Sequence, residues 1–467
     1  MSLDTRTARV PGRTPRSLPR APEARSLHTL TRTATFVEIG AQTLTVGERS
    51  FRNPKSSDAR LVGYKIVADV AGKGVVFVLT VAAARCLAPN AFGVFSLAST
   101  LGWLIAVASD FGIQLHVARA VAARPADAAR TLATWLRVRA WTTAAAIAIV
   151  MGGLIAVDAS ATLAVPILLF ALVYGCSGLV EFLHYFYRGL SRSDVESSLI
   201  LAQRLATLVL GLAALAWRPS VSLLAVAMLA PMAATLLASL RLATRITPPA
   251  NPESRSPSPE SFWRDVFPIG AGIVLSALYF RIDVFLVDWW RGAEAVALYN
   301  AVFRLVEALR LFPAAVLAVM LPSLVRARDR APLVRVSVGV TLFAAAVAVV
   351  LWPAAGILVP LLYGRTYVEA VPAFRILTLS FPLLSLNYAL TYQLVAWNGQ
   401  RVYAVLCGFA LLVNVALNAT LIPAASIDGA AWATLATELF LTLGCVWALA
   451  TRDTAPASDV AAAGLPA

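Results

Sequence analysis

The chain has 467 residues, of which 59% are apolar and only 14% charged, and its net charge is +14. Soluble globular domains are about half apolar and about a quarter charged, so this composition excludes an ordinary water-soluble protein. The basic residues lie in short loops between apolar segments and near the N-terminus rather than in one patch. That placement excludes a nucleic-acid partner and indicates membrane topology.

Motifs for catalysis, nucleotide binding and metal binding are absent from the sequence. It holds no GxxxxGK[ST] phosphate loop, no GxGxxG, no DxD and no HExxH motif. The four cysteines lie singly in apolar segments, without the paired spacing of a metal site or a disulfide framework. We therefore expect no enzyme activity, no catalytic residues, no metal and no cofactor. Transport would depend on an ion gradient or on the substrate gradient rather than on ATP.

The N-terminal residues 1–59 are rich in Arg, Pro, Ser and Thr, which predicts a disordered basic cytoplasmic tail that can contact membrane lipids. The apolar segments that follow are long enough to cross the roughly 30 Å hydrocarbon layer as helices. They predict an all-α integral membrane protein with about 12 transmembrane helices. The predicted helices are 62–85, 92–115, 134–157, 161–186, 196–217, 220–243, 265–290, 296–321, 333–358, 370–394, 402–423 and 428–450.

Charge in the predicted loops indicates the topology. Loops after even-numbered helices are rich in arginine, whereas loops after odd-numbered helices are short and hold few positive charges. By the positive-inside rule, the arginine-rich loops and both termini lie in the cytoplasm, including a C-terminal tail at 451–467. The exceptions on the outer side are Arg85, Arg218, Arg291 and Arg365, each near the end of a helix.

A Pro- and Ser-rich stretch predicts a division of the membrane region into two halves. Residues 244–262 are predicted to be a cytoplasmic linker between six-helix lobes at 60–243 and 263–450. The segments Phe92–Ala98 and Val296–Val302 resemble each other and open the second helix of each half. Six helices return the chain to its starting side, so the lobes would be related by a pseudo-twofold axis along the membrane normal. The expected substrate path lies between them.

Ionisable side chains within apolar segments are costly in lipid and therefore indicate a cavity, a partner or a function. Buried cations that outnumber buried anions need an anionic guest, and phosphate or pyrophosphate forms charge-assisted hydrogen bonds with guanidinium groups. Salt bridges that only lock helices together are the alternative. The candidate substrate-binding cations are Lys73, Arg204, Arg281, Arg304 and Arg310. The candidates for H⁺ or Na⁺ coupling are Asp69, Glu181, Asp283 and Glu307.

Several motifs resemble those of bacterial polysaccharide flippases, which translocate O-antigen and exopolysaccharide precursors. The segment Arg85–Phe95 is similar to their "aR-x-L-G-P-x-x-F-G-x-f" signature, with Ala88 in place of the usual glycine. Tyr279–Asp283 followed by Ala295–Asn300 resembles "yyR-x-D … a-V-g-x-Y-x-a". The other similar segments are Tyr363–Ala370 and, in the last hairpin, Asn414–Asn418, Ile422–Pro423 and Gly429–Ala431. The long basic N-terminal tail departs from the family pattern.

The resemblance implies membership of the multidrug/oligosaccharidyl-lipid/polysaccharide exporter superfamily. It implies an alternating-access flippase in the bacterial inner membrane that moves a polyprenyl-pyrophosphate-linked oligosaccharide to the outer leaflet for lipopolysaccharide or exopolysaccharide synthesis. Polysaccharide-assembly proteins are the implied protein partners. A small-molecule or multidrug exporter of the same superfamily is the alternative. A glycosyltransferase or polymerase would need a sizeable outer loop, and the predicted outer loops are all short.

Overall fold

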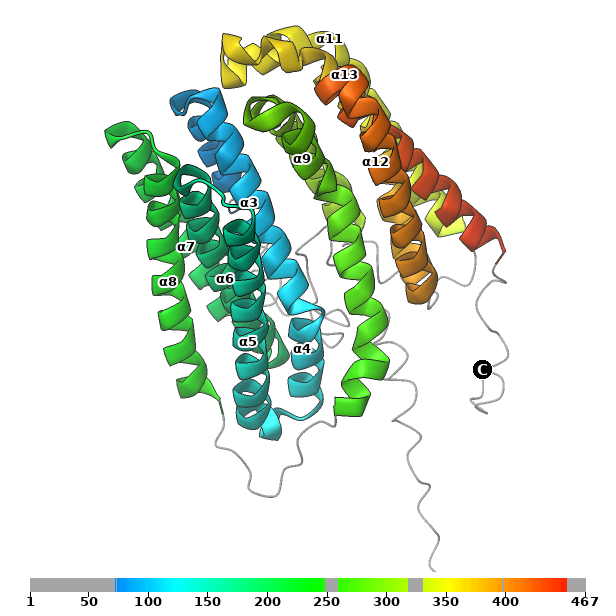
Figure 1. Ribbon diagram of the computed structural model, residues 1–467. Helices are drawn as coiled ribbons and strands as arrows, with labels where there is room; N and C mark the ends of the chain where they lie inside the picture. Colours follow the sequence, from blue (N-terminus) through cyan, green and yellow to red (C-terminus); the bar gives the residue numbers. More distant parts are fainter. Residues whose placement is uncertain (1–71, 73, 248–258, 318–330, 397–398, 452–467) are drawn as a thin grey trace, which may run out of the picture.

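The computed structural model describes residues 72, 74–247, 259–317, 331–396 and 399–451 (Figure 1). Within these residues the regular elements are all helical, which confirms the predicted all-α class. The predicted N-terminal tail, residues 452–467 of the predicted C-terminal tail and the centre of the predicted linker lie outside the described residues, as do Asp69 and Lys73.

The first half of the described chain begins with a short apolar helix, Gly74–Cys86. Each further predicted segment of this half overlaps a helix. These helices are α3 (Pro89–Asp110), α4 (Ile113–Ala123), η2 (Pro125–Asp127), α5 (Ala128–Ala156), α6 (Ala161–Gly189), α7 (Ser193–Trp217) and α8 (Val221–Ile246).

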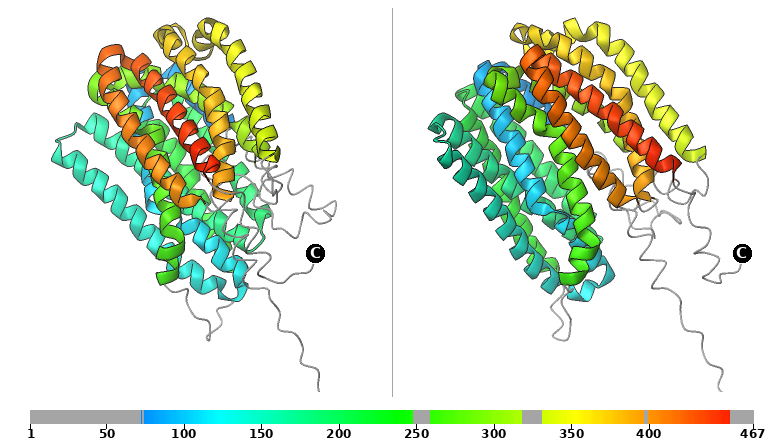
Figure 2. Two further views of the ribbon diagram at one scale, coloured as in Figure 1. Left: turned by 90° about the vertical axis from the view of Figure 1, so that its right-hand side faces the viewer. Right: turned by 45° about the vertical axis from the view of Figure 1, so that its right-hand side comes forward.

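The second half contains fewer but longer helices. They are α9 (Pro259–Leu309), α11 (Ala331–Tyr363), η3 (Arg365–Ala370), α12 (Val371–Ala396) and α13 (Gln400–Ala450). Non-helical backbone interrupts α9 at Gly292, with φ 77°, and α13 at Ser426, with φ 54°. The chain reverses direction at both breaks, which lie at the upper end of the molecule as drawn in Figures 1 and 2. Each is therefore a helical hairpin, as expected from the predicted pairs of helices.

The predicted helix 92–115 is wrong in one respect, because the structure breaks it between α3 and α4. Phe111 and Gly112 both adopt left-handed backbone, with φ 43° and 82°. The Asp110 carboxylate accepts hydrogen bonds from the backbone N–H groups of Gly112 (3.1 Å) and Gln114 (3.2 Å). Gly112 is the N-cap residue of α4, and Asp110, two residues before it, stabilises the start of the helix by satisfying these two backbone N–H groups.

The length and composition of the helices identify a multi-pass membrane protein. In the described part of the chain, nine helices are long and apolar enough to span a bilayer, with α9 and α13 each counted once. Large apolar side chains such as Ile149, Trp217 and Val349 are exposed on the outside of the bundle. Such surfaces are unfavourable in water and are typical of contact with lipid.

The two halves meet where α3 runs along α9, while α6 packs on α3 and α13 packs on α9 (Figures 1 and 2). Glycines allow the close approach at both ends of this contact. A Cβ atom on Gly93 would lie 1.8 Å from the Ala293 carbonyl oxygen. A Cβ atom on Gly270 would lie 2.5 Å from the Phe111 carbonyl oxygen. The groups between these two ends form the candidate site.

Candidate functional site

A small cavity lies in the contact between the two halves, bounded by α3, α6 and α9. Its volume is about 60 Å³. Its lining consists of Thr100, Trp103, Tyr174, Phe280, Arg281, Arg304 and Glu307. Two of the predicted substrate-binding arginines and one predicted ion-coupling carboxylate therefore meet at one place.

Arg281 is the buried cation of this cavity, with 3% of its surface exposed. Its Nη2 donates hydrogen bonds to Asn300 Oδ1 (2.6 Å) and Thr100 Oγ1 (2.9 Å), and its guanidinium carbon lies 4.8 Å from the centre of the Phe303 ring. Its Nη1 is buried and has no hydrogen-bond partner among the described residues. A buried guanidinium that keeps an unused donor favours an additional acceptor.

Arg304 lines the same cavity from the part of α9 that follows the break at Gly292. Its Nη1 donates to Glu307 Oε2 at 2.6 Å, and both side chains are only partly buried. Its Nε, like Arg281 Nη1, is buried without a hydrogen-bond partner in the part of the chain that the structure describes. Two arginines and one carboxylate thus leave the lining with one net positive charge. An anionic group would neutralise this charge and accept the unused N–H groups.

Asp283 does not share the cavity with Arg281, although the two residues are two positions apart. The Asp283 carboxylate accepts a hydrogen bond from the Tyr299 hydroxyl and one from the Val284 backbone N–H (2.9 Å). The Tyr299 hydroxyl also lies 3.1 Å from Thr434 Oγ1 on α13. Residues two positions apart on a helix point in nearly opposite directions, which explains the separation.

Arg310, a further predicted cation that directly follows the last residue of α9, belongs to another cluster. Its guanidinium carbon lies 4.1 Å from the Phe280 ring centre and 5.1 Å from that of Tyr388 on α12. Glu438 of α13 is within electrostatic range of Arg310, and its carboxylate accepts a hydrogen bond from Asn387 Nδ2 at 2.7 Å. Arg310 therefore stabilises contacts between α9, α12 and α13 rather than lining the cavity.

Two further predicted residues lie in the first half, outside the cavity lining. Arg204 of α7 packs beside Gly72, where an added Cβ atom would meet Arg204 Cγ at 3.4 Å. Glu181 of α6 lies within electrostatic range of Asp110 and Arg139. The structure brings neither side chain to the cavity between the halves.

Arg139 and Glu438 are buried ionisable residues that the sequence analysis does not identify. Arg139 Nη2 donates to the Ala106 carbonyl oxygen (2.9 Å), Nη1 donates to Ser109 Oγ, and Nε lies 3.7 Å from Asp110 Oδ1. Both residues lie within predicted transmembrane helices. A charged side chain in such a helix is costly in lipid, and this criterion is enough to mark Arg139 and Glu438 as candidates from the sequence.

Glu438 also changes the predicted charge balance. The second half holds three arginines that are buried or partly buried, Arg281, Arg304 and Arg310, against three such carboxylates, Asp283, Glu307 and Glu438. Counted together, these six charges balance, and Lys73, another of the predicted cations, lies outside the described residues. The excess is local, because Asp283 and Glu438 face other partners and leave the cavity lining with one net positive charge.

Solved structures that are similar to this chain are membrane transporters. The lipid II flippase MurJ, in an inward closed conformation, matches with a TM-score of 0.65 and 12% identity, over 83% of this chain and 87% of that chain. A MOP superfamily transporter from Pyrococcus furiosus matches with a TM-score of 0.57 and 15% identity, over 84% of this chain and 94% of that chain. MATE in the bent conformation matches with a TM-score of 0.59 and 16% identity, over 87% and 98% of the two chains. This chain therefore has the fold of MOP superfamily transporters.

Sequence comparison provides the family. No curated protein sequence matches this chain. The family described as "Polysaccharide biosynthesis protein" matches residues 59–328, which is more than half of the chain and includes α3 to α9. The match covers both arginines of the cavity and the Arg85–Phe95 and Tyr279–Asp283 motifs. The chain belongs to the polysaccharide biosynthesis protein family.

Proposed function

We propose that this protein is an alternating-access flippase that moves a polyprenyl-pyrophosphate-linked oligosaccharide from the cytoplasmic to the outer leaflet. The family match and the fold shared with a lipid II flippase support a transporter of lipid-linked precursors. The substrate would serve the synthesis of lipopolysaccharide or exopolysaccharide, together with polysaccharide-assembly proteins. The two predicted six-helix lobes would move against each other along the contact between α3 and α9.

The observation that carries this proposal is the pair of unused donors, Arg281 Nη1 and Arg304 Nε, in a cavity with net positive charge. A pyrophosphate bears several anionic oxygens and can accept from both guanidinium groups at once. The cavity of about 60 Å³ is much smaller than an oligosaccharide. The lobes must therefore separate at one end before the substrate enters, with the lipid chain remaining in the bilayer.

The orientation in the membrane follows from the arginine distribution. Both termini and the 244–262 linker are proposed to face the cytoplasm of a bacterial cell, with the protein in the inner membrane. The breaks at Gly292 and Ser426 and the Cys86–Pro89 turn would then lie on the outer side. Coupling to H⁺ or Na⁺ through Glu181, Asp283 or Glu307 remains part of the proposal.

A small-molecule exporter is the second candidate function, because MATE structures match this chain over a similar length. The aromatic side chains Trp103, Tyr174 and Phe280 in the lining could bind an organic cation through cation–π contacts. The net positive charge of the same lining opposes a cationic guest, which favours the flippase.

Proteoliposomes that contain the purified full chain would separate these functions. The assay measures translocation of a fluorescent pyrophosphate-linked polyprenyl oligosaccharide, the same lipid with a neutral linkage, and a cationic dye. We expect translocation of the pyrophosphate-linked lipid alone. Efflux of the dye without translocation of the lipid would contradict the proposal.

A further inference from the structure

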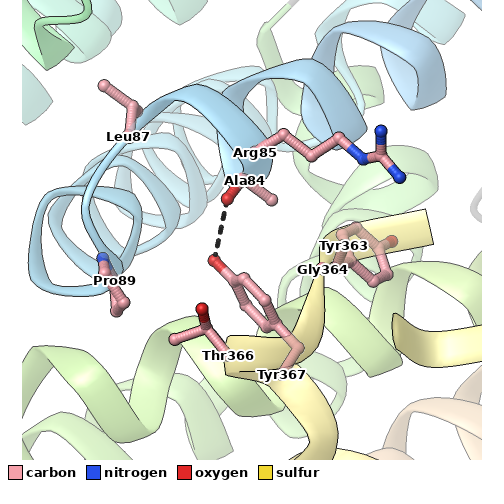
Figure 3. A pocket seen from close by; sticks show the side chains of 8 residues that line it. All are labelled: Ala84, Arg85, Leu87, Pro89, Tyr363, Gly364, Thr366 and Tyr367. Atoms are coloured by element: carbon pink, nitrogen blue, oxygen red, sulfur yellow. Dashed lines mark hydrogen bonds between the residues drawn. The ribbon is translucent and has the colours of Figure 1, made fainter. Parts of the chain in front are cut away.

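A larger pocket lies at the proposed outer end of the molecule, where the turn before α3 meets the turn between α11 and α12 (Figure 3). Its volume of about 430 Å³ falls within the range of roughly 300–1,000 Å³ that is typical of small-ligand pockets. In Figure 3, Thr366 and Tyr367 extend toward the Ala84–Pro89 turn, and the Tyr367 hydroxyl donates to the Ala84 carbonyl oxygen (3.3 Å). The pocket is therefore formed jointly by the two halves of the chain.

The lining of this outer pocket carries positive charge. Among the described residues that form it, Arg85 is charged and no carboxylate is present. Arg85 Nε donates to the Leu362 carbonyl oxygen (2.7 Å), and Nη2 donates to that of Leu361. These bonds satisfy two carbonyls in the last turn of α11 and fix the guanidinium beside that helix end, while the Arg85 side chain as a whole is exposed. Arg365, also exposed, stands between two lining residues in the sequence.

Tyr363 connects the outer pocket with the cationic cavity. It lines the outer pocket, is almost fully buried, and lies within electrostatic range of Arg304. Its hydroxyl is buried and makes no hydrogen bond with any described residue. A buried hydroxyl without a partner is costly, so an acceptor on a ligand would be favourable there. Tyr363 therefore lines the outer pocket and is also close to Arg304 of the cationic cavity.

We propose that the outer pocket is a second anion site, which takes the pyrophosphate and adjoining sugar of the substrate after they leave the cationic cavity. This inference rests on the proposed flippase function for the identity of the ligand. It also gives a reason for Arg85 and Arg365 to lie on the outer side, where the positive-inside rule disfavours arginine. Free inorganic anions and anionic lipid headgroups share this chemistry, so the test includes both.

The test uses a cysteine inside the pocket as a reporter. The full chain with Cys86→Ser and Thr366→Cys is reconstituted in phosphatidylcholine vesicles, and the rate of maleimide labelling is measured with and without farnesyl pyrophosphate. Thr366 is exposed and lines the pocket, so a bound ligand should cover it. The matched control is native Cys86, which is exposed on the same turn but does not line the pocket.

We expect farnesyl pyrophosphate to slow labelling at position 366 and not at Cys86. Farnesol, which lacks the anion, should have no effect. Adding Arg85→Gln to the reporter variant should raise the concentration of farnesyl pyrophosphate that gives half-maximal protection by about tenfold. The reason is the loss of one charge-assisted hydrogen bond between the guanidinium and the pyrophosphate. Protection by inorganic pyrophosphate as well would support an anion site that does not need the polyprenyl chain.

Three results would overturn the second site: no protection, equal protection by farnesol, or equal protection in the Arg85→Gln variant. Protection by phosphatidylglycerol in the vesicles, with no further effect of the probe, would instead identify a lipid-headgroup site and overturn the assignment to substrate. The Arg281→Ala variant separates this inference from the proposed function, because protection at position 366 should persist in it. Persistent protection, with unimpaired translocation by Arg281→Ala, would contradict the central site and leave the outer anion site standing.

Discussion

Arg281 and Asn300 are 19 positions apart, yet Arg281 Nη2 donates to Asn300 Oδ1 at 2.6 Å and both side chains are buried. The reversal of α9 at Gly292 makes this contact possible, because it places the two residues on adjacent antiparallel helices. Thr100 of α3 accepts a second hydrogen bond from the same nitrogen. One guanidinium therefore links the first half of the chain to both arms of the α9 hairpin.

The native cysteines provide a direct test of topology. Within the described residues Cys86 is exposed at the proposed outer turn, whereas Cys407 and Cys445 are buried and Cys176 is partly buried. We expect a membrane-impermeant maleimide to label intact cells at Cys86, and Cys86→Ser to abolish that label. As a control, a cysteine introduced in the Cys86→Ser background by Ser256→Cys, in the proposed cytoplasmic linker, should react only after permeabilisation. The reverse pattern would show that the orientation is wrong.

The contact between α3 and α9 should not tolerate a side chain at Gly93. The Cβ atom of Gly93→Ala would meet backbone atoms of Ala293 that cannot rotate away, so the helices must separate. Overpacking of this kind costs about 1–3 kcal/mol, and we expect a lower thermal midpoint and a lower folded yield in detergent. Gly152→Ala on α5 is the matched control, since nothing lies within 4 Å of its added methyl group. Equal stability of the two variants would contradict the close packing described above.

Arg139 and Asp110 should behave as a structural pair. Arg139→Ala leaves a buried Asp110 carboxylate without its cation, and breaking a buried ion pair typically costs about 3–5 kcal/mol. We expect the single variant to lose most of its folded yield and the Arg139→Ala, Asp110→Asn double variant to recover part of it. Fluorescence-detected size-exclusion chromatography measures the yield. An additive loss in the double variant would show that the two groups do not interact.

The sequence predicts the helices well because lipid requires long apolar segments whose backbone groups are satisfied internally. It also identifies Arg281 and Arg304, since a charge inside such a segment stands out. Their neutral partners Thr100 and Asn300 carry no comparable signal, because threonine and asparagine occur in membrane helices for many reasons. The break between α3 and α4 could not be predicted either. It depends on local backbone geometry that an apolar segment does not reveal.

The central claim is that Arg281 binds the anionic group of the substrate rather than holding the fold together. The measurement is translocation of lipid-linked oligosaccharide per molecule of folded protein for Arg281→Ala, with Arg137→Ala, an exposed arginine on α5, as the control. Loss of a charge-assisted hydrogen bond of about 1.5–3 kcal/mol predicts that the translocation rate per folded molecule falls at least about tenfold, while the folded yield stays nearly unchanged. Arg281→Lys should restore only part of the rate, because lysine retains the charge but not the planar fork. The contradicting result is a collapse of folded yield in Arg281→Ala that Glu307→Gln restores, which would make Arg281 a structural counter-ion.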